Sequence, residues 1–196
     1  MSEQRPLALV SCKPRAIRYQ PDYSWEVWTM NDGWRYCSRI DKLFEMHDWD
    51  WRKDKKGRHE SYMSALKKMH TPIVMLKHYD DIPASVPYPI MDVESRVLPP
   101  GYRKQDLFSS TASYMIAMAI LYRYQYIKLI GFNEMVDTVR LNLSFWMGLA
   151  LGKGIQLTIE DAPAPFHSLY MYGYGESEYL DHTGKWDIGL PIETTD

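Results

Sequence analysis

Short runs of apolar residues, each ended by polar or turn-forming residues, recur along the chain and predict the strands of a sheet. They occupy residues 7–10, 25–30, 42–46, 72–76, 126–130 and 155–159. These runs lack the strict alternation of apolar and polar residues that is typical of a strand with one face in water. Continuous apolar strands are typical of a parallel sheet whose two faces are both covered.

Segments with helical spacing lie between these runs, at about residues 59–70, 112–120 and 138–151. The second segment is apolar nearly all round, which predicts deep burial, and Ser109, Ser110 and Thr111 precede it as candidate caps. Gly152 and Gly154 follow the third segment, as glycine does at helix ends. The alternation of strands and helices predicts the α/β class, as a single Rossmann-like three-layer domain with a mostly parallel sheet of about six strands.

The domain organisation follows from where this alternation stops. We expect residues 1–162 to form the Rossmann-like domain and residues 163–196 to be a loop-rich C-terminal tail, packed on the domain or extending from it. The proline-rich stretch 80–106 is predicted to be an irregular surface excursion without a long helix. The tail carries tyrosines between Tyr170 and Tyr179, which keep a protein-interaction module open as an interpretation.

Composition and charge narrow the partners. The chain has 196 residues and a net charge of −2, so a nucleic-acid partner is not indicated. No apolar run approaches the roughly 20 residues that cross a bilayer, and no signal peptide is evident, so we expect a cytoplasmic protein and no membrane partner. The basic stretch 52–58 fits a solvated surface or a phosphate contact. An oligomer stays open.

Polar residues finish the predicted strands. Because ligands bind beyond the carboxyl ends of parallel strands, these residues predict a site at one edge of the sheet. They are Ser11, Cys12, Lys13, Asn31, Asp32, His47, Asp48, Lys77, His78, Asn133, Glu134, Glu160 and Asp161. Ordinary loop polarity explains any one of them, whereas their convergence indicates a site. Backbone N–H groups at the start of the helix after Ser109, Ser110 and Thr111 would suit a phosphate or a carboxylate.

Several familiar motifs are missing. The chain has no G-x-G-x-x-G after its first strand, no P-loop and no G-x-S-x-G elbow, which argues against a standard dinucleotide dehydrogenase, a P-loop nucleotide hydrolase and a serine hydrolase. Asp48-Trp49-Asp50 could hold a divalent cation on nucleotide phosphates, although two aspartates at this spacing also arise by chance. No cofactor and no metal-ligand set is assigned from the sequence.

Two blocks, residues 109–120 and 126–132, resemble the buried helix and following strand of bacterial sialyltransferases and of motility-associated-factor glycosyltransferase-like proteins. Small phage-encoded Rossmann-like proteins are similar at residues 28–31, 44–47 and 148–155 as well. The resemblance covers about two thirds of the chain. It implies a Rossmann-like domain that binds a nucleotide or a nucleotide-sugar, and, for a phage-encoded protein, a place in the host cytoplasm.

The chain departs from these families at three points. The glycine-rich turn that follows the first strand in the transferases is here Ser11-Cys12-Lys13-Pro14, in which Lys13 could supply charge in place of close backbone approach. The Gly-Ile-Asp that often ends the fifth strand is here Gly131-Phe132-Asn133. Neither His47 nor His78 stands in a full catalytic motif of the sialyltransferases.

Three functional hypotheses remain. The first is a glycosyltransferase-like enzyme, with His47 or His78 as the general base and Asp48 orienting it. Its nucleotide-binding residues would be Ser11, Lys13, Asn31, Ser109, Ser110, Thr111 and Asn133. The second is a non-catalytic phage accessory protein that binds or sequesters a nucleotide, and the third is the protein-interaction module. Fold alone does not choose between them.

Overall fold

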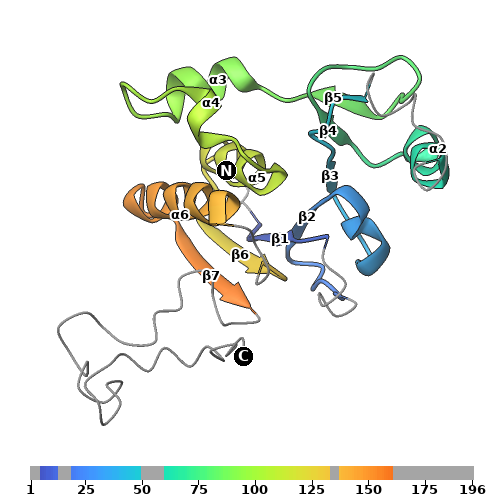
Figure 1. Cartoon of the computed structure of the whole chain (residues 1–196). Helices are drawn as coiled ribbons and strands as arrows, with labels where there is room; N and C mark the ends of the chain where they lie inside the picture. Colours follow the sequence, from blue (N-terminus) through green and yellow to red (C-terminus); the bar gives the residue numbers. More distant parts are fainter. Residues whose placement is uncertain (1–4, 13–18, 50–59, 133–136, 161–196) are drawn as a thin grey trace, which may run out of the picture. The chain divides into compact units, whose positions relative to one another are not determined.

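Seven strands form one all-parallel sheet in the part of the chain that the computed structural model describes, residues 5–12, 19–49, 60–132 and 137–160 (Figure 1). The strands are β1 (Leu7–Val10), β2 (Glu26–Met30), β3 (Lys42–Phe44), β4 (Ile73–Met75), β5 (Ser85–Pro87), β6 (Tyr126–Ile130) and β7 (Gln156–Glu160). Their order across the sheet is β5-β4-β3-β2-β1-β6-β7. The predicted α/β, Rossmann-like class is confirmed.

The sheet has one strand more than the sequence predicted. The additional strand, β5, lies in the proline-rich stretch for which we expected irregular structure, and it pairs with β4 at one edge of the sheet. Because an edge strand leaves one row of backbone groups unpaired, it tolerates Pro87, which cannot donate a hydrogen bond. The rest of the stretch contains two short helices, α3 (Ile90–Arg96) and α4 (Lys104–Leu107), so the expected absence of a long helix there holds.

Helices cover the two faces of the sheet. On one face α5 (Thr111–Leu121) and α6 (Asp137–Gly152) pack against each other, with α3 beside α5 (Figure 1). Every residue of α5 except Tyr114 is buried, which confirms the prediction drawn from its all-round apolar sequence. On the other face α2 (Glu60–Lys68) packs against the side chains of β3 and β4, and the 3-10 helix η1 (Asn31–Tyr36) follows β2 directly.

The chain enters the sheet at β1 and builds it in both directions. Strands β2 to β5 extend to one side, and then the chain crosses back to place β6 and β7 on the other side of β1. Ligands of open parallel sheets bind where the strand order reverses in this way, beyond the carboxyl ends. The backbone N–H of Ser11, after β1, donates to the carbonyl of Ile130 at the end of β6 (2.9 Å), so the two strand ends are joined.

Some expectations fall outside the described residues. They include the proposed tail at 163–196 with its tyrosines, the basic stretch 52–58, and the end of the predicted domain at residue 162. Among the helices that the structure does describe, none has the length and apolar character needed to cross a membrane.

Candidate functional site

A hollow of about 310 Å³ opens at the carboxyl edge of the sheet. Met46, Leu76 and Tyr88, which follow β3, β4 and β5, form one side of it. Tyr114 in the second turn of α5 and Phe108 just before this helix form the other side. The remaining lining residues are Ile90, Lys104 and Gln105. The hollow therefore occupies the edge at which the sequence predicted a site.

Aromatic rings that pack against one another form the walls of this hollow. Tyr88 and Tyr114 meet edge to face at a centroid distance of 5.0 Å, and Phe108 lies 4.4 Å from the ring of Tyr114. The Tyr88 hydroxyl donates a hydrogen bond to the backbone carbonyl of Tyr114 (3.1 Å). Burial raises the pKa of both tyrosines, so both phenols stay neutral at physiological pH. Such walls suit the flat or apolar face of a base or sugar ring.

The cation that lines this hollow is already neutralised. The Lys104 ammonium lies 3.1 Å from a carboxylate oxygen of Glu94. A phosphate bound at this edge would therefore depend on hydrogen bonds from other groups.

The start of α5 offers such groups. Ser110 is the N-cap residue, but its side chain makes no capping hydrogen bond and instead lies 3.4 Å from the hydroxyl of Ser113. Of the three candidate caps, Ser110 therefore does not form a side-chain cap, because its hydroxyl turns toward a neighbouring side chain. Ser109 is exposed and Thr111 is buried, so Ser109 and Ser110 are the hydroxyls that a ligand could reach.

A buried carboxylate holds a histidine at the same edge. Glu45 follows β3 and is fully buried, and the Tyr62 hydroxyl of α2 donates to its Oε2. Its Oε1 accepts the backbone N–H of His47 (3.1 Å) and lies 2.5 Å from Nδ1 of the His47 ring. Since an ionised carboxylate only accepts, this contact places a proton on Nδ1, and in the neutral ring the lone pair is then on Nε2. The His47 side chain is 43% exposed, so a ligand can reach it.

Sequence reasoning missed Glu45 and turned to Asp48 as the partner of His47. A signal for Glu45 was present: in an extended segment residues two apart lie on the same side, so an acid two positions before a histidine faces it. Asp48 is exposed in the structure. The next residue, Trp49, is buried and donates its ring N–H to Asp81 (3.0 Å), which anchors the segment after His47.

His78, the other candidate base, has a different environment. Its Nδ1 lies 2.9 Å from the carbonyl of Ser85 and 3.0 Å from the Ser85 hydroxyl, while its Nε2 is 3.7 Å from Asp80. These contacts tie together the loop between β4 and β5. The ring is half exposed, but its partners belong to a loop that it helps to shape.

Asn31 lies at the carboxyl end of β2 with an unsatisfied acceptor. Its backbone has a positive φ of 50°, and its side-chain Nδ2 is 3.9 Å from the sulfur of Cys12. Its Oδ1 is buried and has no hydrogen-bond partner among the described residues. Buried polar atoms usually have a partner, so this oxygen is a candidate acceptor for a ligand N–H or O–H. Ser11, the neighbouring candidate, is buried.

Five predicted residues cannot be placed in this geometry. They are Lys13, Asp50, Asn133, Glu134 and Asp161, which lie outside the described residues, so the proposed D-x-D metal site stays a prediction. Within the described ranges no group of three or more His, Cys, Asp or Glu side chains is arranged to hold a metal ion.

Comparisons with known proteins find chains of similar structure but none of similar sequence. No protein-family model matches the chain, and no curated protein matches it by sequence. Two solved structures of the sialyltransferase CstII from Campylobacter jejuni are similar to it. One, in complex with the substrate analogue cytidine-5'-monophosphate, has a TM-score of 0.51 at 16% identity over 80% of this chain and 79% of that chain. The other, in complex with CMP-3FNeuAc, has a TM-score of 0.50 at 15% identity over 80% of each chain. At this identity the likeness is one of fold.

Proposed function

We propose that the chain is a glycosyltransferase-like protein that binds a nucleotide-sugar at the carboxyl ends of its strands. The observation that carries the proposal is the fixed histidine at the same edge of the sheet as the aromatic hollow. Glu45 and His47 flank Met46, and Met46 itself lines the hollow. His47 does not itself line the hollow, but it follows the same strand as Met46 and lies at the edge where parallel sheets bind ligands.

The donor would use three groups at this edge. Its base or sugar ring would stack on the aromatic walls formed by Phe108 and Tyr114. Its phosphate would accept hydrogen bonds from the first N–H groups of α5 and from the Ser110 hydroxyl, where the helix dipole favours an anion. The free Oδ1 of Asn31 would accept a hydrogen bond from a ribose hydroxyl or an exocyclic amine. Cytidine nucleotides are the first ligands to test, because the similar sialyltransferase structures hold them.

The transfer itself needs one base. The hydroxyl oxygen of the acceptor would attack the anomeric carbon of the donor while Nε2 of His47 takes the hydroxyl proton. The bond between the anomeric carbon and the phosphate oxygen breaks, and the nucleotide leaves with that electron pair. Glu45, already in contact with Nδ1, would stabilise the imidazolium that forms. A positioned base of this kind contributes roughly 10²–10⁴-fold to a rate.

Nucleotide binding without transfer is the second candidate, and the turn after β1 favours it. The Ser11 N–H is engaged by Ile130 and its side chain is buried. This turn therefore does not present that N–H to a phosphate, as a glycine-rich turn would.

Histidine variants separate the two candidates. We expect the wild-type chain to bind cytidine-5'-monophosphate and to release it from a CMP-sugar. His47→Gln should keep the dissociation constant within about twofold, yet lose roughly 10²–10⁴-fold in turnover, since a base is removed and the binding groups remain. His70→Gln is the matched control, because His70 is exposed beyond the end of α2. His78→Gln tests the other candidate base.

Titration calorimetry and a nucleotide-release assay measure the two quantities separately. Binding without any release by the wild type would favour the second candidate. Equal turnover in wild type and His47→Gln would remove His47 as the base, and the absence of nucleotide binding would contradict both candidates.

A further inference from the structure

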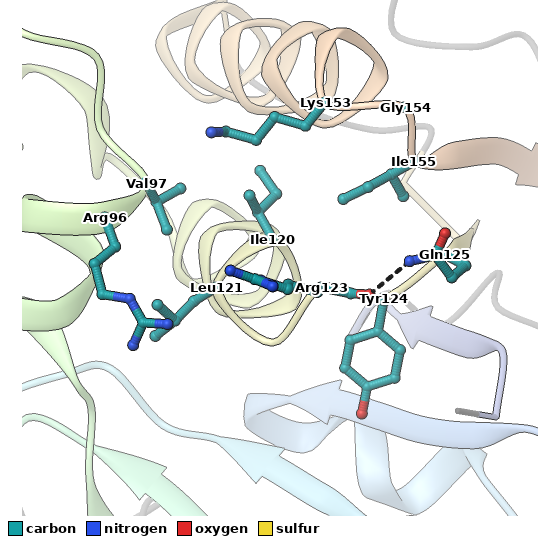
Figure 2. Close-up of a pocket in the computed structure, with 10 residues that line it drawn as sticks. All are labelled: Arg96, Val97, Ile120, Leu121, Arg123, Tyr124, Gln125, Lys153, Gly154 and Ile155. Atoms are coloured by element: carbon teal, nitrogen blue, oxygen red, sulfur yellow. Dashed lines mark hydrogen bonds between the residues drawn. The ribbon is translucent and has the colours of Figure 1, made fainter. Parts of the chain in front are cut away.

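A second hollow, of about 360 Å³, lies at the opposite edge of the sheet (Figure 2). It is bounded by Gln125 and Ile155, which precede β6 and β7, and by the ends of α3, α5 and α6. Because α5 and α6 run antiparallel to the strands, their C-terminal ends meet at this amino edge. The hollow is therefore separate from the site of the proposed nucleotide-sugar chemistry.

Three cations from three different helices surround this hollow. Arg96 is the last residue of α3, Arg123 follows α5 by two residues, and Lys153 follows α6 directly. Arg96 lies 3.9 Å from the carboxylate of Asp92. For Arg123 and Lys153 no acidic partner is found within the described ranges. A helix C-terminus attracts a cation, and because three helix ends meet here, three cations surround one hollow.

The backbone at Arg123 has a conformation that residues other than glycine disfavour. Arg123 has a positive φ of 60°, a conformation that costs free energy in any residue with a Cβ atom. The end of α6 has the same cap. At the end of α5 the Tyr124 N–H donates to the carbonyl of Ala119, five residues before it, and at the end of α6 the Ile155 N–H donates to the carbonyl of Ala150 in the same way. The position that Arg123 has at the end of α5 is held at the end of α6 by Gly154, with φ 81°. Glycine is favoured at this left-handed position after a helix, yet the chain has an arginine there after α5.

The walls between the cations are apolar. Val97, Leu121 and Ile155 are each buried and line the hollow. Figure 2 shows the side chains of Arg123 and Lys153 extending over this apolar lining, while the Tyr124 ring points away toward the sheet. There the Tyr124 hydroxyl donates to Glu26, so Tyr124 lines the hollow without offering its hydroxyl to a ligand. An apolar base under a cationic rim suits an organic anion rather than a metal ion.

We propose that this hollow is a binding site for a small phosphorylated metabolite of nucleotide size. Its phosphate oxygens would accept hydrogen bonds from Arg96, Arg123 and Lys153. Its apolar part would lie on Val97 and Ile155. The volume lies in the range of small-molecule sites.

Isoleucine methyl groups locate the ligand by NMR. Ile120 and Ile155 line this hollow, whereas Ile90 lines the hollow at the carboxyl edge. With the full chain labelled at isoleucine methyls, adenosine 5'-diphosphate should shift the signals of Ile120 and Ile155. Inorganic pyrophosphate should shift them at higher concentration, because it lacks the apolar part.

Two variants test the cations. Arg123→Gly and Lys153→Gln should each raise the dissociation constant measured at Ile155 about tenfold, the usual effect of losing a hydrogen bond to a charged group. Arg123→Gly places glycine where φ is positive, so this variant should fold at least as stably as the wild type. Lys68→Gln is the matched control, since it removes one exposed lysine from the end of another helix.

Two results would overturn the proposal. One is the absence of any shift at Ile120 and Ile155 at millimolar adenosine 5'-diphosphate. The other is a shift that persists with unchanged affinity in both Arg123→Gly and Lys153→Gln. If the first result comes with a shift at Ile90, nucleotide binding at the carboxyl edge is supported instead. Failure of the two proposals can therefore be told apart.

Discussion

Gly33 sits where a single added methyl group should disturb the carboxyl edge of the sheet. It is buried in η1, directly after β2. A Cβ atom at this position would lie 2.1 Å from Oγ1 of Thr29, 3.0 Å from the carbonyl oxygen of Ser11 and 3.4 Å from Cα of Cys12. The closest of these atoms is a fully buried hydroxyl that donates to the carbonyl of Val10 (3.0 Å). In Gly33→Ala, therefore, either Thr29 rotates or η1 moves away from β1.

Both responses have a cost that can be estimated. Overpacking a filled interior costs about 1–3 kcal/mol. Rotating Thr29 also removes its hydrogen bond to Val10, and leaving a buried polar group unsatisfied costs about 1–3 kcal/mol more. We therefore expect Gly33→Ala to lower the free energy of unfolding by about 1–3 kcal/mol if η1 moves and by about 2–6 kcal/mol if Thr29 rotates, a large share of the roughly 5–15 kcal/mol of a typical domain.

Urea unfolding followed by tryptophan fluorescence measures this change, and two further variants make it specific. Gly148→Ala is the matched control, because a Cβ atom there meets nothing within 4 Å and alanine favours the helix, so it should stabilise the protein by about 0.5–1 kcal/mol. In a Thr29→Ala background, Gly33→Ala should cost about 1–2 kcal/mol less, since the nearest atom is gone. A cost below about 0.5 kcal/mol, or the same cost in both backgrounds, would refute the packing described here.

Two other predictions concern titratable groups. Burial alone would raise the pKa of Glu26, but hydrogen bonds from Lys42, Tyr124 and Trp28 outweigh it and hold that pKa below its ordinary value. The stability that Glu26 contributes is therefore complete at neutral pH and is lost as the pH falls through its folded-state pKa. Glu26→Gln should cost about 1–3 kcal/mol at pH 7 and progressively less below pH 4 in urea unfolding, and a pH-independent cost would contradict this. Burial also raises the pKa of the Cys37 thiol to about 11. A Cys12→Ala variant, which keeps that thiol alone, should react with a disulfide reagent at pH 8 roughly 100-fold more slowly than a free cysteine, and labelling at the free rate would show that Cys37 is not buried.

Local sequence predicted the strands of the sheet well because a strand buried on both faces is a continuous run of apolar residues. Each long apolar run became a strand within one or two residues of its expected bounds. Strand β5 escaped for the same reason. It has three residues, of which Val86 and Pro87 are exposed at the edge of the sheet, so its sequence contains no continuous apolar run. Its existence depends on pairing with β4, which a local pattern does not contain.

The sequence predicted where in the fold the candidate site lies, but it predicted fewer of the residues that form the site. The carboxyl edge follows from parallel topology alone, so strand ends such as Asn31 and His47 could be listed in advance. The aromatic hollow could not, because Tyr88 and Tyr114 are 26 residues apart and meet only where the residue after β5 packs against α5. Glu45 was passed over because a glutamate is expected in water, and only the packing of α2 shows that it is buried beside Tyr62.

Net charge says little about anion binding in a fold of this kind, and the two edges of the sheet show why. At the carboxyl edge the groups that would hold a phosphate are backbone N–H groups at the start of α5 and serine hydroxyls, which add nothing to a count of charges. The cation that lines the hollow there, Lys104, is held by Glu94. At the amino edge the helices present their carbonyl ends, which repel an anion, so any anion site must be built from side-chain cations. Arg123 and Lys153 supply such cations at the hollow of the amino edge, although the net charge of the chain is −2. The distribution of charge over the two edges, rather than its sum, is therefore what bears on the ligands of this protein.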